Sequence, residues 1–564
     1  LRLSATWYEA EGSKIGSAEA IGDGEREIQS MIDTLARAAI ADLAQGDVGG
    51  RQQLAAQTTF SSEALKAYLK GQAALRAFNY QAAIDPLSTA VEEDSTFALA
   101  HYRLSLAVGW AGQLQRAHRH ARRAAELSGE LPKQDRRLLR ANEAFYFGEA
   151  EEAERLYRTV LQNHPDDAWA HYMLGETLFH FNGVRGRPVM EARRPLRRAL
   201  ELDPSSAEPL PHLVTLASME GDRARIDSLT SGLRERGLPP LVRTTFRAVR
   251  AHVLSDGPSP ALRKRLQEDP IAAWGGALSL WAGEHLEAAS QMVDPLTSPE
   301  RPDEMRAGML TKQAELLAAQ GRIQTARQKL QAVAALDSAA YWMARARLAA
   351  LPFLPERTGR EQTDVRMGLS SWNAETVPER LLPPRFLLPR ELYPAGRLYR
   401  IGLLRAQAGQ TEEALRAAHR LERMDGTILT PSGPADFARS IRAEVERRRN
   451  RTKKALAHLE ARENRVGQAP VFFSLHSGAR ERFLRAELLA QEGRLEEALQ
   501  WYRTLNGIAW GDLPYLAPAH LGRARVLERL DRDEEAARAY RQGLKLWSEA
   551  DPEFQPRIED ARSR

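Results

Sequence analysis

The feature that most constrains this chain is a set of small side chains that returns every 34 residues. Within residues 64–97 the small residues are Gly71, Ala83 and Ala90, with Leu87 between the alanines, and 34 residues further on the same positions hold Ser105, Ala117, Ala124 and Ala121. Small side chains at helical spacing let two helices approach closely. The pattern therefore predicts helical hairpins, each of which buries its apolar face only by stacking on the next.

The later part of the chain keeps this pattern with more variation. A unit at residues 168–204 has Gly175, Ala192, Leu196, Ala199 and Pro204, with extra residues at Asn182–Pro188 that predict a longer loop between its helices. Proline ends helices, so Pro204 marks the turn to the next unit. We expect further helical pairs at 207–234, 271–296, 304–338, 396–424, 477–505 and 517–547, and a basic helix at 435–462.

The first residues follow a different pattern. Leu1–Glu9 alternates apolar and polar side chains, as a half-buried strand does, and a second strand is expected at Lys14–Ala20. Ile28–Leu43 carries apolar residues at helical spacing. These elements predict the end of a truncated α/β domain, followed by a linker. Since the sequence begins with Leu1 and shows no signal-peptide pattern, we expect it to be a piece of a longer polypeptide.

Composition excludes several classes of function. The chain has no cysteine, which excludes disulfides and thiolate metal sites. Its net charge of +5 is too small to indicate nucleic-acid binding by itself. The longest apolar stretch, Ile271–Trp281, is shorter than the ~20 residues of a membrane span.

The period and its residues resemble the tetratricopeptide repeat (TPR). More specifically, Ser62–Ala107 and Phe483–Asp551 resemble the ends of the TolB-like/TPR carboxyl-terminal sensor region of bacterial Hanks-type serine/threonine kinases and related regulators. The resemblance implies an all-α fold, a right-handed TPR-type α-solenoid with a small truncated α/β element at its amino end. It also implies a position on the periplasmic side of a membrane, tethered through an upstream segment; without it we expect a cytoplasmic protein.

These patterns divide the chain into six expected segments. They are the end of a TolB-like domain (1–45), a linker (46–60), an N-terminal TPR array (61–350), a Pro-rich interruption through which helices do not run (351–394), a C-terminal TPR array (395–550) and a tail (551–564). We expect the Pro-rich interruption to divide the array into two lobes.

The candidate binding site is the concave groove that the first helix of each repeat lines in this fold. Aromatic and arginine side chains on an open groove are favoured at binding hot spots. The groove residues are Tyr68, Gln72, Arg76, Tyr102, Arg103, Trp110, Trp169, Tyr172, Glu176, Phe179 and His180. The alternative for each of them is simple packing between helices.

The sequence predicts no enzyme and no cofactor. It has no nucleophile elbow, no phosphate-binding loop, no zinc-protease motif and none of the kinase catalytic motifs. His118 and His120 lie two residues apart and diverge on a helix, so they do not share a metal. Carboxylate pairs such as Asp166–Asp167 are explained by helix capping.

The function predicted is a non-catalytic scaffold or sensor region that binds a protein or peptide in its groove, within a bacterial signalling or envelope protein. One alternative is a regulator or scaffold that binds nucleic acid or another polyanion through the basic cluster at 447–454. Another is a sensor of a small molecule. The sequence does not identify the partner or the oligomeric state.

Overall fold

The computed structural model describes residues 1–8, 14–24, 27–43, 58–59, 61–77, 79–231, 238–255, 257–354, 359–373, 377, 389–467 and 475–564. The chain forms two compact units. Unit 1 comprises Leu1–Thr177, Ala192–Leu210 and Arg236–Pro239, and unit 2 comprises Leu178–Glu191, Pro211–Glu235 and Pro240–Arg564.

Unit 1 begins with a two-stranded sheet and a helix. Strands β1 (Arg2–Tyr8) and β2 (Lys14–Ile21) pair antiparallel, with Arg2 opposite Ile21 and an irregularity between Trp7 and Tyr8. Helix α1 (Ile28–Leu43) packs against β2. The two strands and the helix lie where the sequence predicts them, and the expected linker at 46–60 falls almost entirely outside the described residues.

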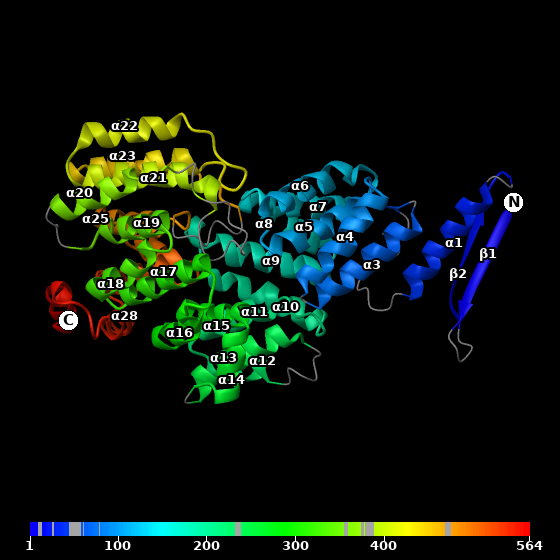
Figure 1. The fold of residues 1–564 in the computed structure, drawn as a ribbon, viewed down its shortest axis with the longest axis horizontal. Coiled ribbons are helices and arrows are strands. Elements are labelled where there is room, and N and C mark those ends of the chain that lie inside the picture. Colours follow the sequence, from blue (N-terminus) through cyan, green and yellow to red (C-terminus); the bar gives the residue numbers. More distant parts are fainter. Residues whose placement is uncertain are drawn as a thin grey trace. The chain divides into compact units, whose positions relative to one another are not determined.

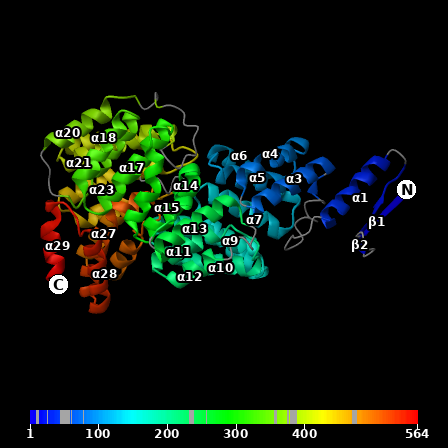
Figure 2. The ribbon, with the colours of Figure 1, turned by 60° about the horizontal axis from the view of Figure 1, so that its bottom comes forward.

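The rest of unit 1 consists of antiparallel helical hairpins, which both views show side by side (Figure 1, Figure 2). Their elements are α3 (Ser62–Arg76), α4 (Tyr80–Glu93), α5 (Ala98–Trp110), α6 (Leu114–Glu126), η2 (Leu127–Glu130), α7 (Lys133–Tyr146), α8 (Ala150–Asn163), α9 (Ala168–Phe181) and α10 (Arg193–Leu202). Helix α9 continues past Thr177, so its last turn belongs to unit 2.

Small residues hold these hairpins together as the 34-residue pattern predicts. Ala83, Ala90, Ala117 and Ala124 have no exposed surface. At Gly175 an added Cβ would lie 2.5 Å from Leu196 Cγ on α10, so α9 and α10 approach closely only because this position has no side chain. The predicted all-α fold of stacked hairpins, with a small α/β element at the amino end, is confirmed.

Unit 2 continues the hairpins through the remainder of the chain. After η3 (Gly183–Arg185) and η4 (Val189–Ala192) come α11 (Leu210–Glu220), α12 (Arg223–Thr230), α13 (Pro240–Leu254), α14 (Pro260–Glu268), α15 (Pro270–Ala282), α16 (Leu286–Val293), η5 (Asp294–Thr297), α17 (Asp303–Ala319), α18 (Ile323–Ala334), α19 (Ser338–Ala349), α20 (Gly359–Ser370), η7 (Arg390–Leu392), α21 (Tyr393–Gln407), α22 (Thr411–Glu422), α23 (Gly433–Arg448), α24 (Thr452–Glu460), α25 (Ala479–Gln491), α26 (Leu495–Arg503), η9 (Trp510–Tyr515), α27 (Leu516–Glu528), α28 (Asp533–Leu546), η10 (Pro552–Phe554) and α29 (Gln555–Arg562).

The early and late hairpins of unit 2 touch each other. Segment η9 packs on α17 as well as on α25 and α27, and Trp510 meets Trp274 of α15 with ring centroids 4.9 Å apart. At the carboxyl end, the backbone N–H of Asp551 donates to the carbonyl of Gly321, and its carboxylate accepts from the backbone N–H of Gln324 at 2.8 Å. Residues far apart in sequence therefore close this unit on itself.

Two segments differ from expectation. The segment 351–394, where prolines are expected to exclude helices, contains α20, because its stretch Gly359–Ser370 has no proline and packs on α19. The tail 551–564 contains α29. None of the described helices is both long and apolar enough to cross a bilayer.

Candidate functional site

The predicted groove residues of unit 1 meet at a cavity of about 60 Å³. Four of the expected residues line it, namely Gln72 and Arg76 from α3, Arg103 from α5 and Trp169 from α9. Asp203, Ser206 and Glu208, from the turn that follows α10, line it as well. The first helices of the hairpins α3–α4, α5–α6 and α9–α10 thus supply the walls, together with Ala199 of α10 and the turn that follows it.

Arg103 forms the cationic part of this cavity. Its guanidinium carbon lies 4.6 Å from the centroid of the Trp169 ring, and the Trp169 indole N–H donates to the hydroxyl of Tyr102. Arg103 is only 6% exposed. A buried guanidinium held over an indole face is kept in place by the cation–π attraction, which strengthens when water is excluded.

Glu208 is the acidic counterpart of Arg103. Burial raises the pKa of its carboxyl to about 7, while the hydroxyl of Ser206, which donates to it, acts in the opposite direction. Arg103 also lowers this pKa, though by less than burial raises it. The cavity therefore changes its charge close to neutral pH.

Gln72 supplies an unused hydrogen-bonding group. Its side chain is 4% exposed, and its Oε1 atom has no hydrogen-bond partner among the described residues. A buried amide oxygen without a partner costs free energy that a donor in the cavity would recover. The site thus offers a cation, an indole face, an acceptor and a titratable carboxyl within one small space.

Other predicted groove residues serve packing. Tyr68 packs against Phe97, with ring centroids 5.1 Å apart, and Trp110 lies between Tyr80 and Phe145. Tyr172 is buried beside Trp169, and its hydroxyl bonds Glu176, so burial and this carboxylate raise its pKa well above the ordinary value. For these side chains the packing alternative describes what the structure shows.

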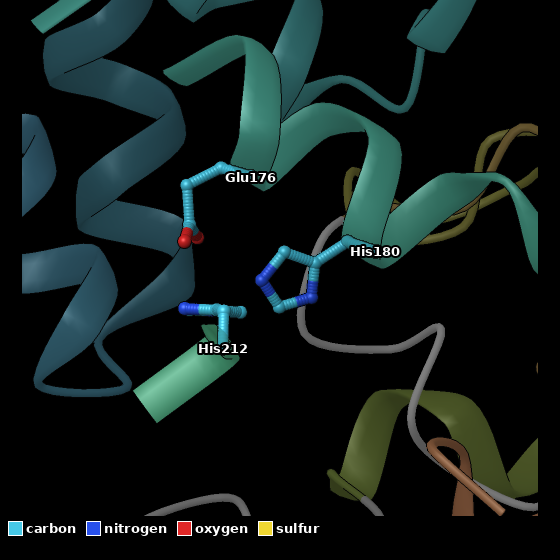
Figure 3. A group of neighbouring side chains, drawn as sticks. All are labelled: Glu176, His180 and His212. Carbon is cyan, nitrogen blue, oxygen red and sulfur yellow. The ribbon is translucent and has the colours of Figure 1, made fainter. Parts of the chain in front are cut away.

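Phe179 and His180 belong to unit 2, where both meet His212 of α11. The rings of Phe179 and His212 lie 4.4 Å apart at their centroids, and those of His180 and His212 lie 5.6 Å apart. Glu176 precedes His180 by one turn of α9, and Figure 3 draws these two side chains together with His212. Two imidazoles and a carboxylate are donors that suit Zn²⁺. Each of the three also has other interactions within the chain, and we assign no metal to them.

The basic cluster at 447–454 is largely ion-paired. Arg447 bonds Glu444, and both Arg449 and Arg451 bond Glu446. The paired carboxylates cancel much of the charge that a polyanion would need, which does not favour the nucleic-acid alternative. The arginines that line a concavity of about 650 Å³ in unit 1 are also ion-paired. Arg158 pairs with Glu154, and Arg198 pairs with Asp166.

Sequence reasoning missed the acidic half of the cavity. Asp203, Ser206 and Glu208 lie between two helices, whereas the groove was expected to be formed by first helices alone. An acidic residue four positions after Pro204, at the start of the next hairpin, was the available signal.

Comparison with known proteins gives a repeat match to one part of the chain. Residues 138–207, from α7 to the turn after α10, match the family "Tetratricopeptide repeat". Matching solved structures include the crystal structure of the APC/C hetero-tetramer Cut9–Hcn1, with 12% identity over 89% of this chain and 96% of that chain and a TM-score of 0.27, at which a likeness carries no argument. No curated protein sequence matches the chain. These findings give no support to the resemblance to kinase sensor regions.

Proposed function

We propose that this tetratricopeptide-repeat protein binds an extended peptide segment of a protein partner, with the cavity of unit 1 as its main side-chain pocket. The observation that carries the proposal is the meeting of Gln72, Arg76, Arg103 and Trp169 around one cavity. These residues come from different hairpins, so a segment that contacts all of them has to run across the repeats.

The size and chemistry of the cavity indicate what it accepts. A cavity of about 60 Å³ is small, so it takes a single side chain of the partner. Arg103 and the free acceptor of Gln72 favour a group that carries both an acceptor and a donor. An extended peptide recognised through a few such pockets orders on binding, and the proposed affinity is modest for that reason.

A role as the sensor or scaffold part of a larger bacterial signalling or envelope protein is a narrower form of the same proposal. It rests on the sequence resemblance at Ser62–Ala107 and Phe483–Asp551 alone. The polyanion alternative is weaker, because the basic cluster at 447–454 is ion-paired.

The test is selection from a displayed library of unstructured peptides on the intact chain, followed by titration of the selected peptides. We expect Arg103→Gln and Arg76→Glu each to weaken binding at least tenfold. Arg119→Gln on the exposed side of α6 is the matched control and should bind as the parent does. Since Arg76 is only half-buried, its variant separates lost binding from lost folding. Equal affinity of all four proteins, or no enriched peptide, would refute the proposal.

A further inference from the structure

The interior of unit 2 contains a cluster of buried charges in which cations outnumber carboxylates. The cations are Lys312, Arg347, Arg400, Arg462 and Arg480, and the carboxylates are Glu315, Glu444 and Glu481. They come from α17, α19, α21, α23, α25 and the segment after α24. Five cations for three carboxylates leave positive charge without compensation inside the protein.

Most members of the cluster have a clear partner. Arg480 bonds Glu444 at 2.7 Å, Lys312 bonds Glu315 at 3.1 Å, and the hydroxyl of Tyr399 donates to Glu481. Each of the three carboxylates thus has at least one donor within the cluster. They also fix the positions of the helices that carry them.

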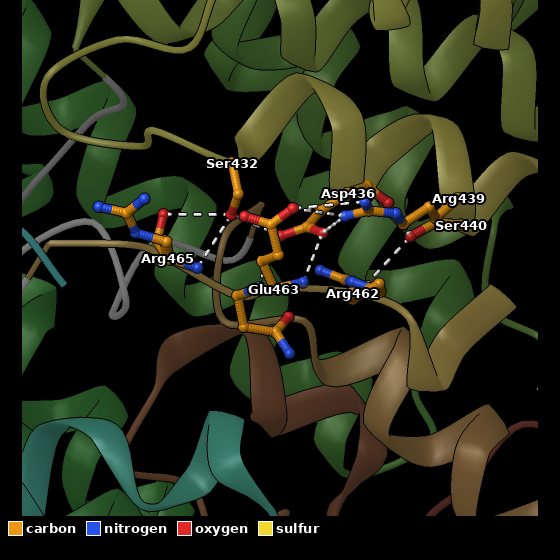
Figure 4. A network of polar contacts seen from close by, with 8 residues as sticks. Ser432, Asp436, Arg439, Ser440, Arg462, Glu463 and Arg465 are labelled. Carbon is orange, nitrogen blue, oxygen red and sulfur yellow. Dashed lines mark hydrogen bonds and ion pairs between the residues drawn. The ribbon is translucent and has the colours of Figure 1, made fainter. Parts of the chain in front are cut away.

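Arg462 is held by a separate network at the start of α23. Asp436 accepts the backbone N–H groups of Glu463 and Asn464, at 2.9 and 2.8 Å, and so pins the segment that follows α24 (Figure 4). From there the guanidinium of Arg462 donates to the hydroxyl of Ser440 and lies 3.4 Å from Glu481. Glu481 is therefore shared between Arg462 and Tyr399, and Nη1 of Arg480 lies 3.9 Å from it.

Arg400 has no such partner. It is 4% exposed, and the structure gives it neither a hydrogen bond nor an ion pair among the described residues; its Nε is enclosed and unsatisfied. Arg347 bonds Glu315 through Nη2 only, which leaves its Nε and Nη1 unsatisfied, and Nη1 of Arg480 makes no hydrogen bond. Besides Nε of Arg462, the guanidiniums of these three arginines thus present unused donors inside one unit.

These three guanidiniums lie close enough to act on the same groups. Burial lowers the pKa of Arg400, and the neighbouring charge of Arg347 lowers it further. Burial raises the pKa of the Tyr515 phenol, and Arg480, Arg400 and Arg347 all oppose that rise. The contacts agree with this: Nε of Arg480 donates to the carbonyl of Ala350, three residues after Arg347, at 3.3 Å. Its Nη1 lies 3.9 Å from Glu481, which accepts from Tyr399, the residue before Arg400.

We propose that Arg347, Arg400 and Arg480 form a binding site for a small oxyanion with two negative charges, of the inorganic phosphate or sulfate type. A buried charge without a partner costs several kcal/mol, so an excess of buried guanidiniums calls for an anion. The planar fork of donors on arginine matches the oxygens of such anions. Two negative charges would balance the excess of cations in the cluster. The site lies in unit 2 and is independent of the peptide cavity in unit 1.

The experiment is isothermal titration and thermal unfolding of the full chain with inorganic phosphate, sulfate and malonate, against chloride at equal ionic strength. Phosphate and sulfate should bind and raise the unfolding temperature. Malonate tests whether a dianion with two carboxylate groups can occupy the site in their place. Arg400→Met should weaken phosphate binding at least tenfold, whereas Arg416→Met, on exposed α22, should bind as the parent does.

A second readout separates binding from folding. In chloride alone, Arg400→Met should unfold at a higher temperature than the parent, because an unpaired buried charge has been replaced by an apolar side chain. In saturating phosphate, Arg400→Met should no longer unfold at a higher temperature than the parent. If Arg400→Met does not fold, Arg347→Gln provides the same comparison. The proposal is overturned if the parent shows no phosphate effect beyond that of chloride, or if the variant that folds binds phosphate as the parent does.

Discussion

The Nδ1 atoms of His101 and His120 lie 3.0 Å apart, and their rings stack with 5.2 Å between centroids. The Nε2 of His101 faces the carbonyl of Ser95 at 3.2 Å and must therefore carry a proton to donate. In neutral His101 the Nδ1 is then an acceptor, and His120 donates to it. Adding a proton to Nδ1 of His101 would place two N–H groups face to face, whereas a proton added to His120 goes to its Nε2 and puts a charge on a partly buried ring.

This histidine pair predicts acid sensitivity of unit 1. Burial, and then the neighbouring His101, lower the pKa of His120 to about 4, below the ordinary 6.5. The unfolded chain therefore binds more protons between pH 6.5 and 4, and the stability contributed by the pair is present above pH 6.5 and lost as the pH falls toward 4. Allowing for partial solvent screening, we expect a loss of ~1–2 kcal/mol. His120→Gln should flatten the change in unfolding temperature across this range; an unchanged slope would contradict the assignment.

Glu208 predicts the opposite dependence on pH. Its pKa rises from 4.5 to about 7 on burial, so the folded chain binds more protons between these values. Its unfavourable contribution is absent below pH 4.5 and grows as the pH rises through 7. Glu208→Gln should therefore be more stable than the parent at pH 8, by ~2–3 kcal/mol, and equal to it at pH 4.5. Chemical denaturation at the two pH values measures the difference, and equal stabilities at pH 8 would count against it.

Gly175→Ala tests the close approach of α9 and α10. Alanine favours a helix over glycine by about 1 kcal/mol, but here its Cβ would lie 2.5 Å from Cγ and Cδ2 of Leu196. Overpacking typically costs ~1–3 kcal/mol, so we expect net destabilisation. Gly129→Ala, whose Cβ would meet nothing within 4 Å, is the control and should be neutral or slightly stabilising. Urea unfolding measures the free energy of unfolding of both variants. Equal changes in the two variants would contradict the prediction.

Asp551→Ala tests the closure of unit 2. The Asp551 carboxylate caps the backbone N–H of Gln324 at the start of α18, where Arg322 supplies no side-chain cap. Loss of a cap costs about 0.5–2 kcal/mol. Asp269→Ala removes a comparable but local cap, on Ala272 of α15. Hydrogen exchange at Gln324 should accelerate in the first variant only; equal rates in both would show that the contact does not hold in solution.

The sequence predicted the parts of this fold that depend on local pattern. The helix at Ile28–Leu43 and the buried alanines at the 34-residue period follow from spacing alone. The cavity was predicted in part: Gln72, Arg76, Arg103 and Trp169 were among the expected groove residues. That they bind a partner remains a prediction.

What the sequence did not reveal depends on contacts between distant residues. Glu208 enters the cavity from a turn, and η9 reaches α17 across nearly two hundred residues. No periodicity encodes such contacts, because they depend on how far each hairpin rotates relative to the last. Arg347, Arg400 and Arg480 likewise read as surface charges in sequence and become neighbours only when unit 2 closes.

The bond between Asp551 and Gly321 changes how unit 2 responds to stress. A stack of repeats with open ends frays one repeat at a time, since each end unit has a single neighbour. Here the carboxyl-terminal residues are fastened to the start of α18, so that end has a second attachment. When force or heat is applied, we therefore expect unit 2 to resist unfolding until the contact at Asp551 breaks. After that, many helices should unfold together.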